Sequence, residues 1–226
     1  MTALIRRSLS TAPFHAFSAP IRGSGKSKLV DIASVIATGE EAPVLSAGGD
    51  DVELEKRLVA SLLTGSPIIS IDNCSRPIGG DLLCQMLTQP MVRPRILGKS
   101  ETPTCPTGAF VAGTGQNFTA IGDMERRTIV CKIDPKMETP ETREFPFEPV
   151  ALAKKSRPQL VVAVLTILRA YHVAGRPDQP KALGSFEEWS NLVRGALLWL
   201  DCADPVSTME EVRMADPRPC GRIFDR

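Results

Sequence analysis

The chain has 226 residues, enough to bury the core of one α/β domain with a helical appendage. Its net charge of only +1 excludes a global basic field that would attract nucleic acid, so any such binding depends on a local cluster of cations. No apolar run reaches the ~18 to 20 residues that a membrane-spanning helix needs, and scattered cysteines without a C-x-x-C pair favour reduced thiols in a cytoplasmic protein.

Five short apolar segments in the first 134 residues have the length of buried strands. Several are continuous apolar runs, which is typical of a sheet that is covered on both faces. Segments with helical periodicity separate them, and this alternation predicts an α/β layer with a mainly parallel sheet. The predicted strands are residues 14–19, 42–47, 67–72, 108–114 and 127–134.

Three amphipathic segments are predicted to form the helices between these strands. Apolar side chains repeat at helical spacing in a segment that stops at Gly39, and again in a segment that closes on Gly65. In the third segment, residues 79–90, Asp81 is expected to cap the helix N-terminus.

The composition changes after Asp134. A Pro- and Glu-rich stretch, residues 135–149, is expected to form a linker or a surface loop. Beyond this stretch only helices are predicted. The sequence therefore divides into a core unit, residues 1–145, and a helical C-terminal region, residues 146–226.

Two helices are predicted in the C-terminal region, over residues 157–175 and 185–200. Ser185 and Glu188 have the spacing of a capping box at the start of the second helix. A third, shorter helix is expected near Ser207.

The segment between the first predicted strand and the first predicted helix, residues 20–27, has the sequence PIRGSGKS. Between a strand and a helix, Gly-x-Gly-Lys-Ser aims backbone N–H groups and the helix N-terminus at phosphates. We expect Gly23, Ser24 and Gly25 to bind the phosphates of a nucleotide. Pro20 replaces the first glycine of the motif, at a position where a fixed φ is tolerated. The alternative is a glycine-rich turn with an exposed lysine.

Lys26 is expected to reach the β- and γ-phosphates of ATP, and the Ser27 hydroxyl to ligate Mg²⁺. Asp72 ends the third predicted strand, at the edge where an α/β sheet presents catalytic groups, and is expected to hold Mg²⁺ through water. Asn73 follows it, at a position where many ATPases with this phosphate-binding loop have a glutamate that polarises the attacking water. Either a carboxylate from another part of the chain polarises the water, with Glu55 as a candidate, or hydrolysis of ATP is slow.

Two further polar clusters belong to the candidate site. Asn117 follows the fourth predicted strand, and it can orient the attacking water if that strand lies beside the first one. Arg126 and Arg127 stand where a loop meets the fifth strand. An arginine there can stabilise transition-state charge, often in the site of a neighbouring subunit. The alternatives are a plain Gly/Asn turn and a solvated basic pair.

The ordered segments GSGKS, IISIDN, RILGKSE, GTGQN and DMERR resemble the ATPase domain of phage- and plasmid-type DNA primase/helicase proteins, which are similar to superfamily 3 and AAA+ helicase ATPases. The resemblance covers residues 14–145. It implies an AAA+-like P-loop NTPase fold, a three-layer sandwich with a mainly parallel five-stranded sheet in the order 5-1-4-3-2. It also implies a homo-oligomeric, hexameric ring that moves along single-stranded DNA.

The resemblance also implies roles for single residues. It places Lys26 and Ser27 in the phosphate loop, and makes Asp72 the Walker B acid and Asn117 the sensor residue. Arg127, or Arg126 in its place, becomes the arginine finger.

A hairpin between the Walker B and sensor strands contacts DNA in superfamily 3 helicases. The counterpart in this chain would carry Arg93, Arg95 and Lys99. The alternative for this cluster is a solvated loop.

The sequence thus predicts the ATP- and Mg²⁺-dependent ATPase module of a primase/helicase-like protein, acting on single-stranded DNA in the replication of a phage or mobile element. No primase or zinc module precedes the loop and no DNA-binding domain is evident after it, so we expect an isolated or truncated module. Two alternatives stay open. One is a small-molecule kinase that uses the same loop, and the other is a nucleotide-binding fragment with weak catalysis that serves assembly.

Overall fold

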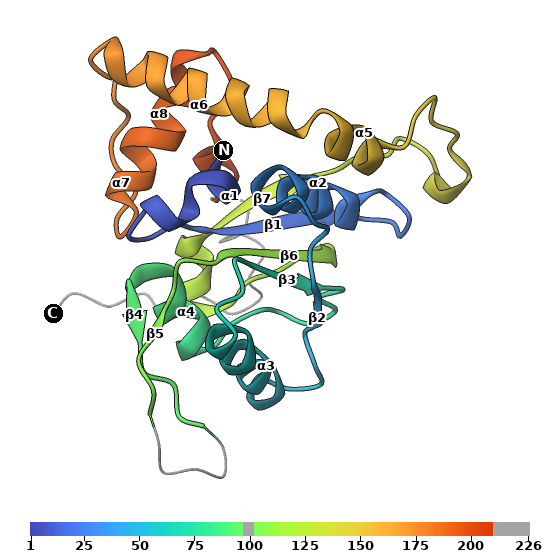
Figure 1. Ribbon diagram of the computed structural model, residues 1–226. Helices are drawn as coiled ribbons and strands as arrows, with labels where there is room; N and C mark the ends of the chain where they lie inside the picture. Colours follow the sequence, from blue (N-terminus) through green and yellow to red (C-terminus); the bar gives the residue numbers. More distant parts are fainter. Residues whose placement is uncertain (97–101, 210–226) are drawn as a thin grey trace, which may run out of the picture.

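The computed structural model describes residues 1–96 and 102–209, and it shows an α/β fold built around one central sheet (Figure 1). The sheet has five strands in the order β2-β3-β6-β1-β7, and every neighbouring pair is parallel. When only the strands of this sheet are numbered along the chain, the order is 2-3-4-1-5. Read from the opposite edge it is 5-1-4-3-2, so the predicted strand order is confirmed. The strands are β1 (Phe14–Ala19), β2 (Val44–Ser46), β3 (Ile68–Asp72), β6 (Phe110–Gln116) and β7 (Thr128–Lys132).

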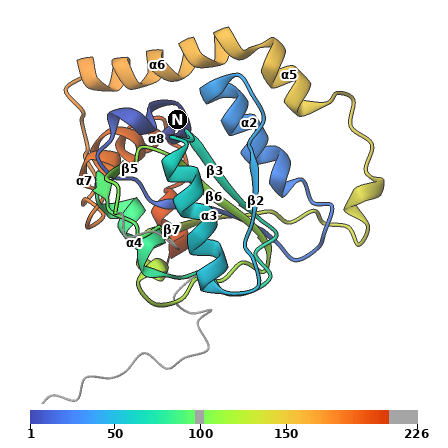
Figure 2. The ribbon, with the colours of Figure 1, turned by 60° about the horizontal axis from the view of Figure 1, so that its bottom comes forward.

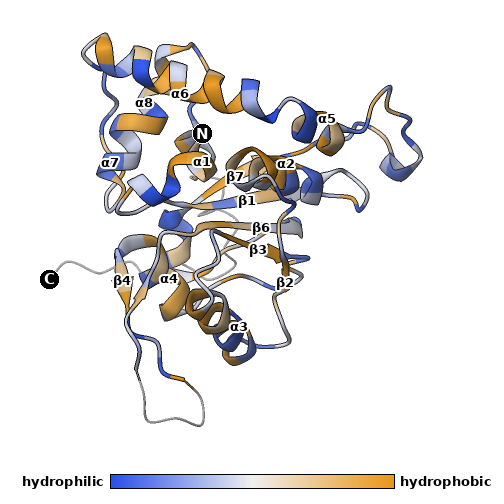
Figure 3. Ribbon diagram, in the orientation of Figure 1, coloured by the Kyte–Doolittle hydropathy of each residue, from blue (hydrophilic) through white to orange (hydrophobic). Residues whose placement is uncertain are grey.

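Apolar side chains leave both faces of this sheet, because successive residues of a strand point to opposite sides. Phe14, Ile69 and Ile71 belong to one buried cluster, whereas Ile68 and Phe110 belong to another. A continuous apolar run in the sequence therefore contributes alternate side chains to the buried clusters on the two faces of the sheet. Figure 3 shows hydrophobic residues along the strands and on the helices that cover them.

Helices cover the sheet on both faces and complete three layers (Figures 1 and 2). α2 (Lys26–Thr38) packs against β1, β3 and β6 on one face. α3 (Asp51–Leu63) and α4 (Asp81–Thr88) lie on the other face, and their leucines join the cluster around Ile69 and Ile71. The short α1 (Thr2–Ile5) contacts α2 and continues into a 3-10 turn, Arg6–Ser8.

Most of the predicted helix boundaries agree with the structure. Gly39 ends α2 in the left-handed region with φ +95°, and α3 is capped by Asp50, whose side chain accepts the N–H of Glu53 at 2.7 Å. The capping prediction for Asp81 is wrong by one position. Gly80 precedes α4 with φ +111°, a conformation that glycine adopts readily, and Asp81 is the first residue of the helix.

The C-terminal region is helical, as predicted, but it is more divided. Among the described helices, none is long and apolar enough to cross a membrane. The elements are α5 (Pro149–Lys155), α6 (Arg157–Val173), α7 (Glu187–Trp189), a π-helical turn (Ser190–Arg194), α8 (Gly195–Trp199) and a 3-10 turn (Pro205–Thr208).

The predicted capping box at Ser185 is wrong. Phe186 is the residue before α7, and Glu188 turns away from the helix terminus. Its carboxylate accepts hydrogen bonds from the N–H and the hydroxyl of Ser10 at 2.8 and 2.9 Å. A tertiary contact therefore takes the carboxylate that the local motif would have used.

The C-terminal helices pack on the sheet unit. Phe186, Trp189 and Val193 are buried in the same cluster as β1 and β3. The indole N–H of Trp189 donates to the hydroxyl of Thr2 at 3.0 Å, which links α7 to the first helix of the chain. Residues from the two predicted regions thus share one hydrophobic cluster.

Gly113 in the middle of β6 offers a test of this packing. A Cβ atom at Gly113 would lie 2.6 Å from Cζ of Phe14, whose ring is fully buried. We expect Gly113→Ala to lower the free energy of unfolding by about 1–3 kcal/mol, because the added methyl group overpacks the core. Urea denaturation measures the effect.

Gly108→Ala is the matched control, because the nearest atom to its new Cβ would be 3.6 Å away and the change in the unfolded chain is the same. Equal stabilities of the two variants would contradict this account of the core.

Candidate nucleotide-binding site

The loop of residues 20–25 joins β1 to α2. Gly23 and Gly25 have φ values of +72° and +84°, in the left-handed region that favours glycine. Gly25 is the N-cap of α2, and no side chain caps the first turn of this helix. The first N–H groups of α2 are therefore not capped by a side chain, and they can bind an anion at the loop.

Side chains of the loop stabilise its shape. The Ser24 hydroxyl donates to the carbonyl oxygen of Ile21 at 2.7 Å, and the Lys26 ammonium donates to the same oxygen at 3.1 Å. Partial burial lowers the pKa of Lys26, and the nearby carboxylate of Asp72 opposes this shift. The ammonium thus lies over the loop, where it can contact phosphate.

Asp72 ends β3 beside the loop, and two hydroxyl groups donate to it. Oδ1 of Asp72 accepts from Ser27 at 3.1 Å and from Thr114 at 2.5 Å. The Thr114 oxygen also accepts the N–H of Asn73 at 3.1 Å, which fixes the chain after the carboxylate. Ser27 and Asp72 offer the hard oxygen donors that Mg²⁺ prefers, so these residues fit the ion.

Thr114 is a site residue that the sequence analysis did not assign. It belongs to β6 and is buried, although it is polar. A hydroxyl group in an otherwise apolar buried strand was the available signal, because a buried hydroxyl needs a partner.

Asn73 has a backbone conformation that accounts for its residue type. Its φ of +54° lies in the left-handed region, where asparagine is tolerated far better than glutamate. Asparagine thus stands where a glutamate often follows a Walker B acid, and the positive φ at this position explains the difference. Glu55 is exposed on α3, and its assignment as the substitute carboxylate stays a prediction.

β6 lies directly beside β1. The predicted role of Asn117 in orienting the attacking water requires this arrangement. The N–H of Asn117 donates to the carbonyl oxygen of Ala19 at 3.2 Å, at the point where the phosphate loop begins. Gln116, which the sequence analysis did not assign, donates to the carbonyl oxygen of Pro20 at 3.1 Å and accepts from Arg22 at 3.2 Å. The end of β6 therefore braces the loop.

Arg126 and Arg127 lie at the amino ends of the strands, opposite the edge of the sheet that carries the loop. Arg126 and Arg127 end a 3-10 helix (Gly122–Arg127), and the next residue, Thr128, pairs with Phe14 at the start of β1. The phosphate loop follows the end of β1, about 17 Å further along the strand at ~3.3 Å per residue. Neither arginine can therefore reach the loop of its own chain.

The two arginines also differ in their contacts. Arg127 is buried, and its guanidinium donates to the carbonyl oxygen of Cys84 at 2.6 Å and to the hydroxyl of Thr88 at 2.7 Å, both in α4. Both arginines also form ion pairs with Asp123, and the hydrogen bond from Arg126 is the main cause of the lowered pKa of that carboxyl. Arg127 is thus occupied within its own chain, whereas the side chain of Arg126 is about half exposed.

The predicted hairpin is present between β3 and β6. β4 (Met91–Val92) and β5 (Cys105–Pro106) pair in antiparallel fashion. Arg93 and Arg95 are exposed on the segment that leaves β4. Lys99, the third predicted contact, lies outside the described residues.

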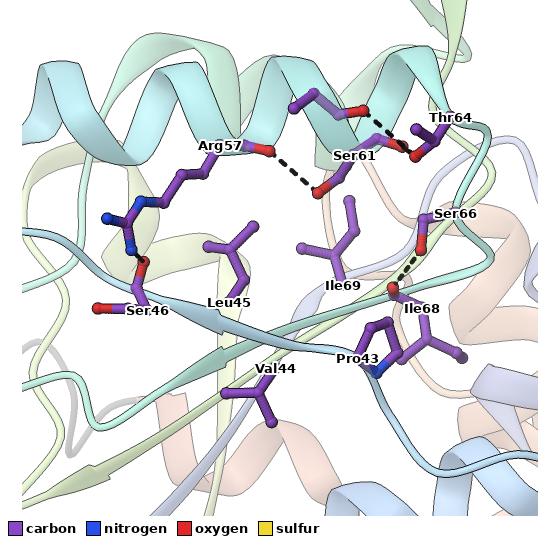
Figure 4. Close-up of a pocket in the computed structure, with 11 residues that line it drawn as sticks. Pro43, Val44, Leu45, Ser46, Arg57, Ser61, Thr64, Ser66, Ile68 and Ile69 are labelled. Atoms are coloured by element: carbon purple, nitrogen blue, oxygen red, sulfur yellow. Dashed lines mark hydrogen bonds between the residues drawn. The ribbon is translucent and has the colours of Figure 1, made fainter.

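A cavity of about 380 Å³ opens between β2 and α3 (Figure 4). Its polar groups are paired with one another: Arg57 donates to the carbonyl oxygen of Ser46 at 3.0 Å, and the hydroxyl of Ser61 donates to the carbonyl oxygen of Arg57 at 3.0 Å. The cavity adjoins the edge strand β2 and contains none of the predicted site residues.

No protein-family model and no curated protein sequence matches the chain. Among solved structures, the apo C-terminal region of NrS-1 is similar with a TM-score of 0.48 and 16% identity, over 70% of this chain and 38% of that one. A structure of JCV helicase is similar with a TM-score of 0.42 and 12% identity, over 92% of this chain and 56% of that one. The chain thus spans 38% and 56% of the length of these two structures.

The class of fold follows from the chain itself. The strand order, the glycine loop between β1 and α2, and the acid at the end of β3 together define a P-loop NTPase-like fold.

The contacts of Arg127 predict a role in stability. We expect Arg127→Ala to lower the free energy of unfolding by about 2–3 kcal/mol, because it removes buried, charge-assisted hydrogen bonds to α4. Arg126→Ala, its matched control, should cost less than about 1 kcal/mol, because its ion pair is exposed. Equal midpoints for the two variants in urea denaturation would refute this assignment.

Proposed function

We propose that this chain is the ATP-binding and ATP-hydrolysing module of a DNA primase/helicase-like protein, which acts on single-stranded DNA in the replication of a phage or mobile element. The hydrogen bond from the Ser27 hydroxyl to Asp72 carries this proposal. It joins the two expected Mg²⁺ ligands at the helix N-terminus that would hold the phosphates. A glycine-rich turn without a nucleotide role would not need this pair of oxygens.

The residues of the loop have separate tasks in this proposal. Backbone N–H groups from Gly23 to Ser27 bind the phosphates, and Lys26 places a positive charge at the γ-phosphate. Ser27 and Asp72 would hold Mg²⁺, which neutralises charge on the β- and γ-phosphates when it is bound. Asn117 orients the attacking water from the end of β6.

A nucleotide-binding module with weak hydrolysis is the second candidate function. The backbone at Asn73 favours it, since β3 then ends without the glutamate that would polarise water. In this case nucleotide binding would serve assembly.

We further propose that an arginine acts on the site of a neighbouring copy in a ring. Both arginines are at the end of the sheet away from their own phosphate loop. Arg126 is the better candidate, because its side chain is exposed while Arg127 binds α4. Arg93 and Arg95, on the exposed segment after β4, are proposed to contact single-stranded DNA.

The central test is ATP hydrolysis by the purified chain with Mg²⁺, with and without single-stranded DNA. We expect turnover that DNA stimulates, and a loss of about 100-fold in Lys26→Ala, because the loop loses a cation aimed at developing charge. Lys155→Ala removes an exposed lysine of α5 and should hydrolyse ATP like the wild type.

Hydrolysis that survives Lys26→Ala would reject the site. Intact ATP binding without turnover would favour the second candidate. DNA-independent transfer of phosphate to a small molecule would instead indicate a kinase.

Action between copies predicts complementation. Arg126→Ala keeps its phosphate loop and Lys26→Ala keeps its arginine, so a mixed oligomer contains some complete sites. We expect each variant alone to lose about 100-fold or more in turnover, and an equimolar mixture to hydrolyse ATP faster than the sum of the two. A mixture that never exceeds this sum would show that Arg126 does not act across a subunit interface.

A further inference from the structure

The connection from β7 to α5, residues 133–148, runs past the phosphate loop, and we call it the strap (Figure 1). It is attached at both ends to the elements that form the loop. The N–H of Ile133 donates to the carbonyl oxygen of Ser18 in β1 at 2.8 Å. Glu148 forms an ion pair with Lys28 in the first turn of α2, and its other oxygen accepts the N–H of Ala151 at the start of α5.

The middle of the strap contacts the phosphate loop itself. A Cβ atom at Gly23 would lie 3.1 Å from the backbone N, the Cβ and Oε2 of Glu141. The backbone and the carboxylate of Glu141 are therefore both close to the loop. Gly23 thus meets two requirements, since it adopts a positive φ and leaves room for the strap.

A short ordered turn holds Glu141 in this place. Glu141 belongs to the 3-10 turn Pro140–Thr142, and Pro140 is buried. The hydroxyl of Thr142 donates to the carbonyl oxygen of Thr139 at 2.8 Å, and the N–H of Arg143 donates to that of Pro140 at 3.1 Å.

The charge of Glu141 conflicts with the ligand that the loop is proposed to bind. N–H groups and Lys26 make the loop attractive to any anion, including a carboxylate. A nucleotide would bring several negative charges to the same place, and like charges a few ångströms apart repel each other. Within the described ranges, no basic side chain forms an ion pair with Glu141 that would offset this charge.

We propose that Glu141 competes with the phosphates of a bound nucleotide, so that the strap moves away from Gly23 when nucleotide binds. This inference rests on the proposed function, because it requires the loop to bind phosphates. The competition weakens nucleotide binding and speeds release.

The strap can pass this movement to the C-terminal helices. It leads directly into α5, and Arg157 at the start of α6 donates to the carbonyl oxygen of Val35 near the end of α2 at 2.9 Å. A displaced strap would therefore pull on α5, and through it on α6, which is attached to α2 by Arg157.

Glu141 is less well placed to act as the missing base. Asp72 and Asn117 come from β3 and β6, on one side of β1, whereas the strap follows β7 on the other side. The carboxylate thus approaches the loop from the flank opposite the proposed Mg²⁺ ligands. A catalytic role is instead one outcome of the test.

The test compares Glu141→Gln with Glu144→Gln, which removes a second exposed carboxylate of the strap and matches the change in net charge. Dissociation constants for Mg-ATP and Mg-ADP are measured by calorimetric titration. We expect Glu141→Gln to bind ATP about fivefold more tightly than wild type, with a smaller gain for ADP, and Glu144→Gln to bind like wild type. Added salt should narrow the difference.

Amide hydrogen exchange supplies a second measurement. With ATP, residues 139–143 of the wild-type protein should exchange faster than without it, because the strap leaves the loop. Unchanged or slower exchange there would overturn the proposal.

Lys26→Ala separates the failure of this inference from the failure of the proposed function. If ATP binding depends on Lys26 but the dissociation constants of Glu141→Gln and Glu144→Gln are equal, only the proposed competition between Glu141 and the phosphates is rejected. Reduced turnover in Glu141→Gln at unchanged affinity would also reject it and would make Glu141 a base. Absence of ATP binding in every variant, or binding that is indifferent to Lys26, would reject both proposals.

Discussion

The carboxylate of Asp72 joins three elements of the fold. Its Oδ1 accepts hydrogen bonds from Ser27 at the start of α2 and from Thr114 in β6. These bonds depend on the parallel arrangement, because β1, β3 and β6 then end at the same edge of the sheet. The positive end of the α2 dipole lies at this edge and favours the negative charge. One carboxylate thus connects β3 to the start of α2 and to β6.

The parallel sheet also separates two groups of candidate site residues. The phosphate loop, Asp72 and Asn117 lie at its carboxyl end, whereas Arg126 and the β4–β5 hairpin connect to its other end. A single chain cannot bring these two groups together, since the length of a strand separates them. Under the proposed function, this separation is the physical reason for assembly, because a second copy can present one end to the other.

Charge at the phosphate loop comes from segments that are far apart in the sequence. Burial lowers the pKa of Lys26, while Asp72 from β3 acts in the opposite direction. Glu141 approaches from the strap, for which the sequence predicted only a Pro- and Glu-rich linker or surface loop. The affinity of such a loop for an anion therefore depends on tertiary contacts as well as on its own residues.

The sequence by itself determined the strands, the main helices and the loop that carries Lys26, because apolar periodicity and glycine position are local properties. It also predicted that Ser27, from the Gly-x-Gly-Lys-Ser motif, and Asp72, from its place at the end of a strand, would hold the same Mg²⁺ ion. Only the tertiary structure decided which polar groups meet: Thr114 binds Asp72, and Glu188 binds Ser10 in place of its own helix. The same holds for the two adjacent arginines, since α4 buries Arg127 and leaves Arg126 exposed. Such choices depend on elements that only the folded chain brings into contact, and no local pattern in the sequence encodes them.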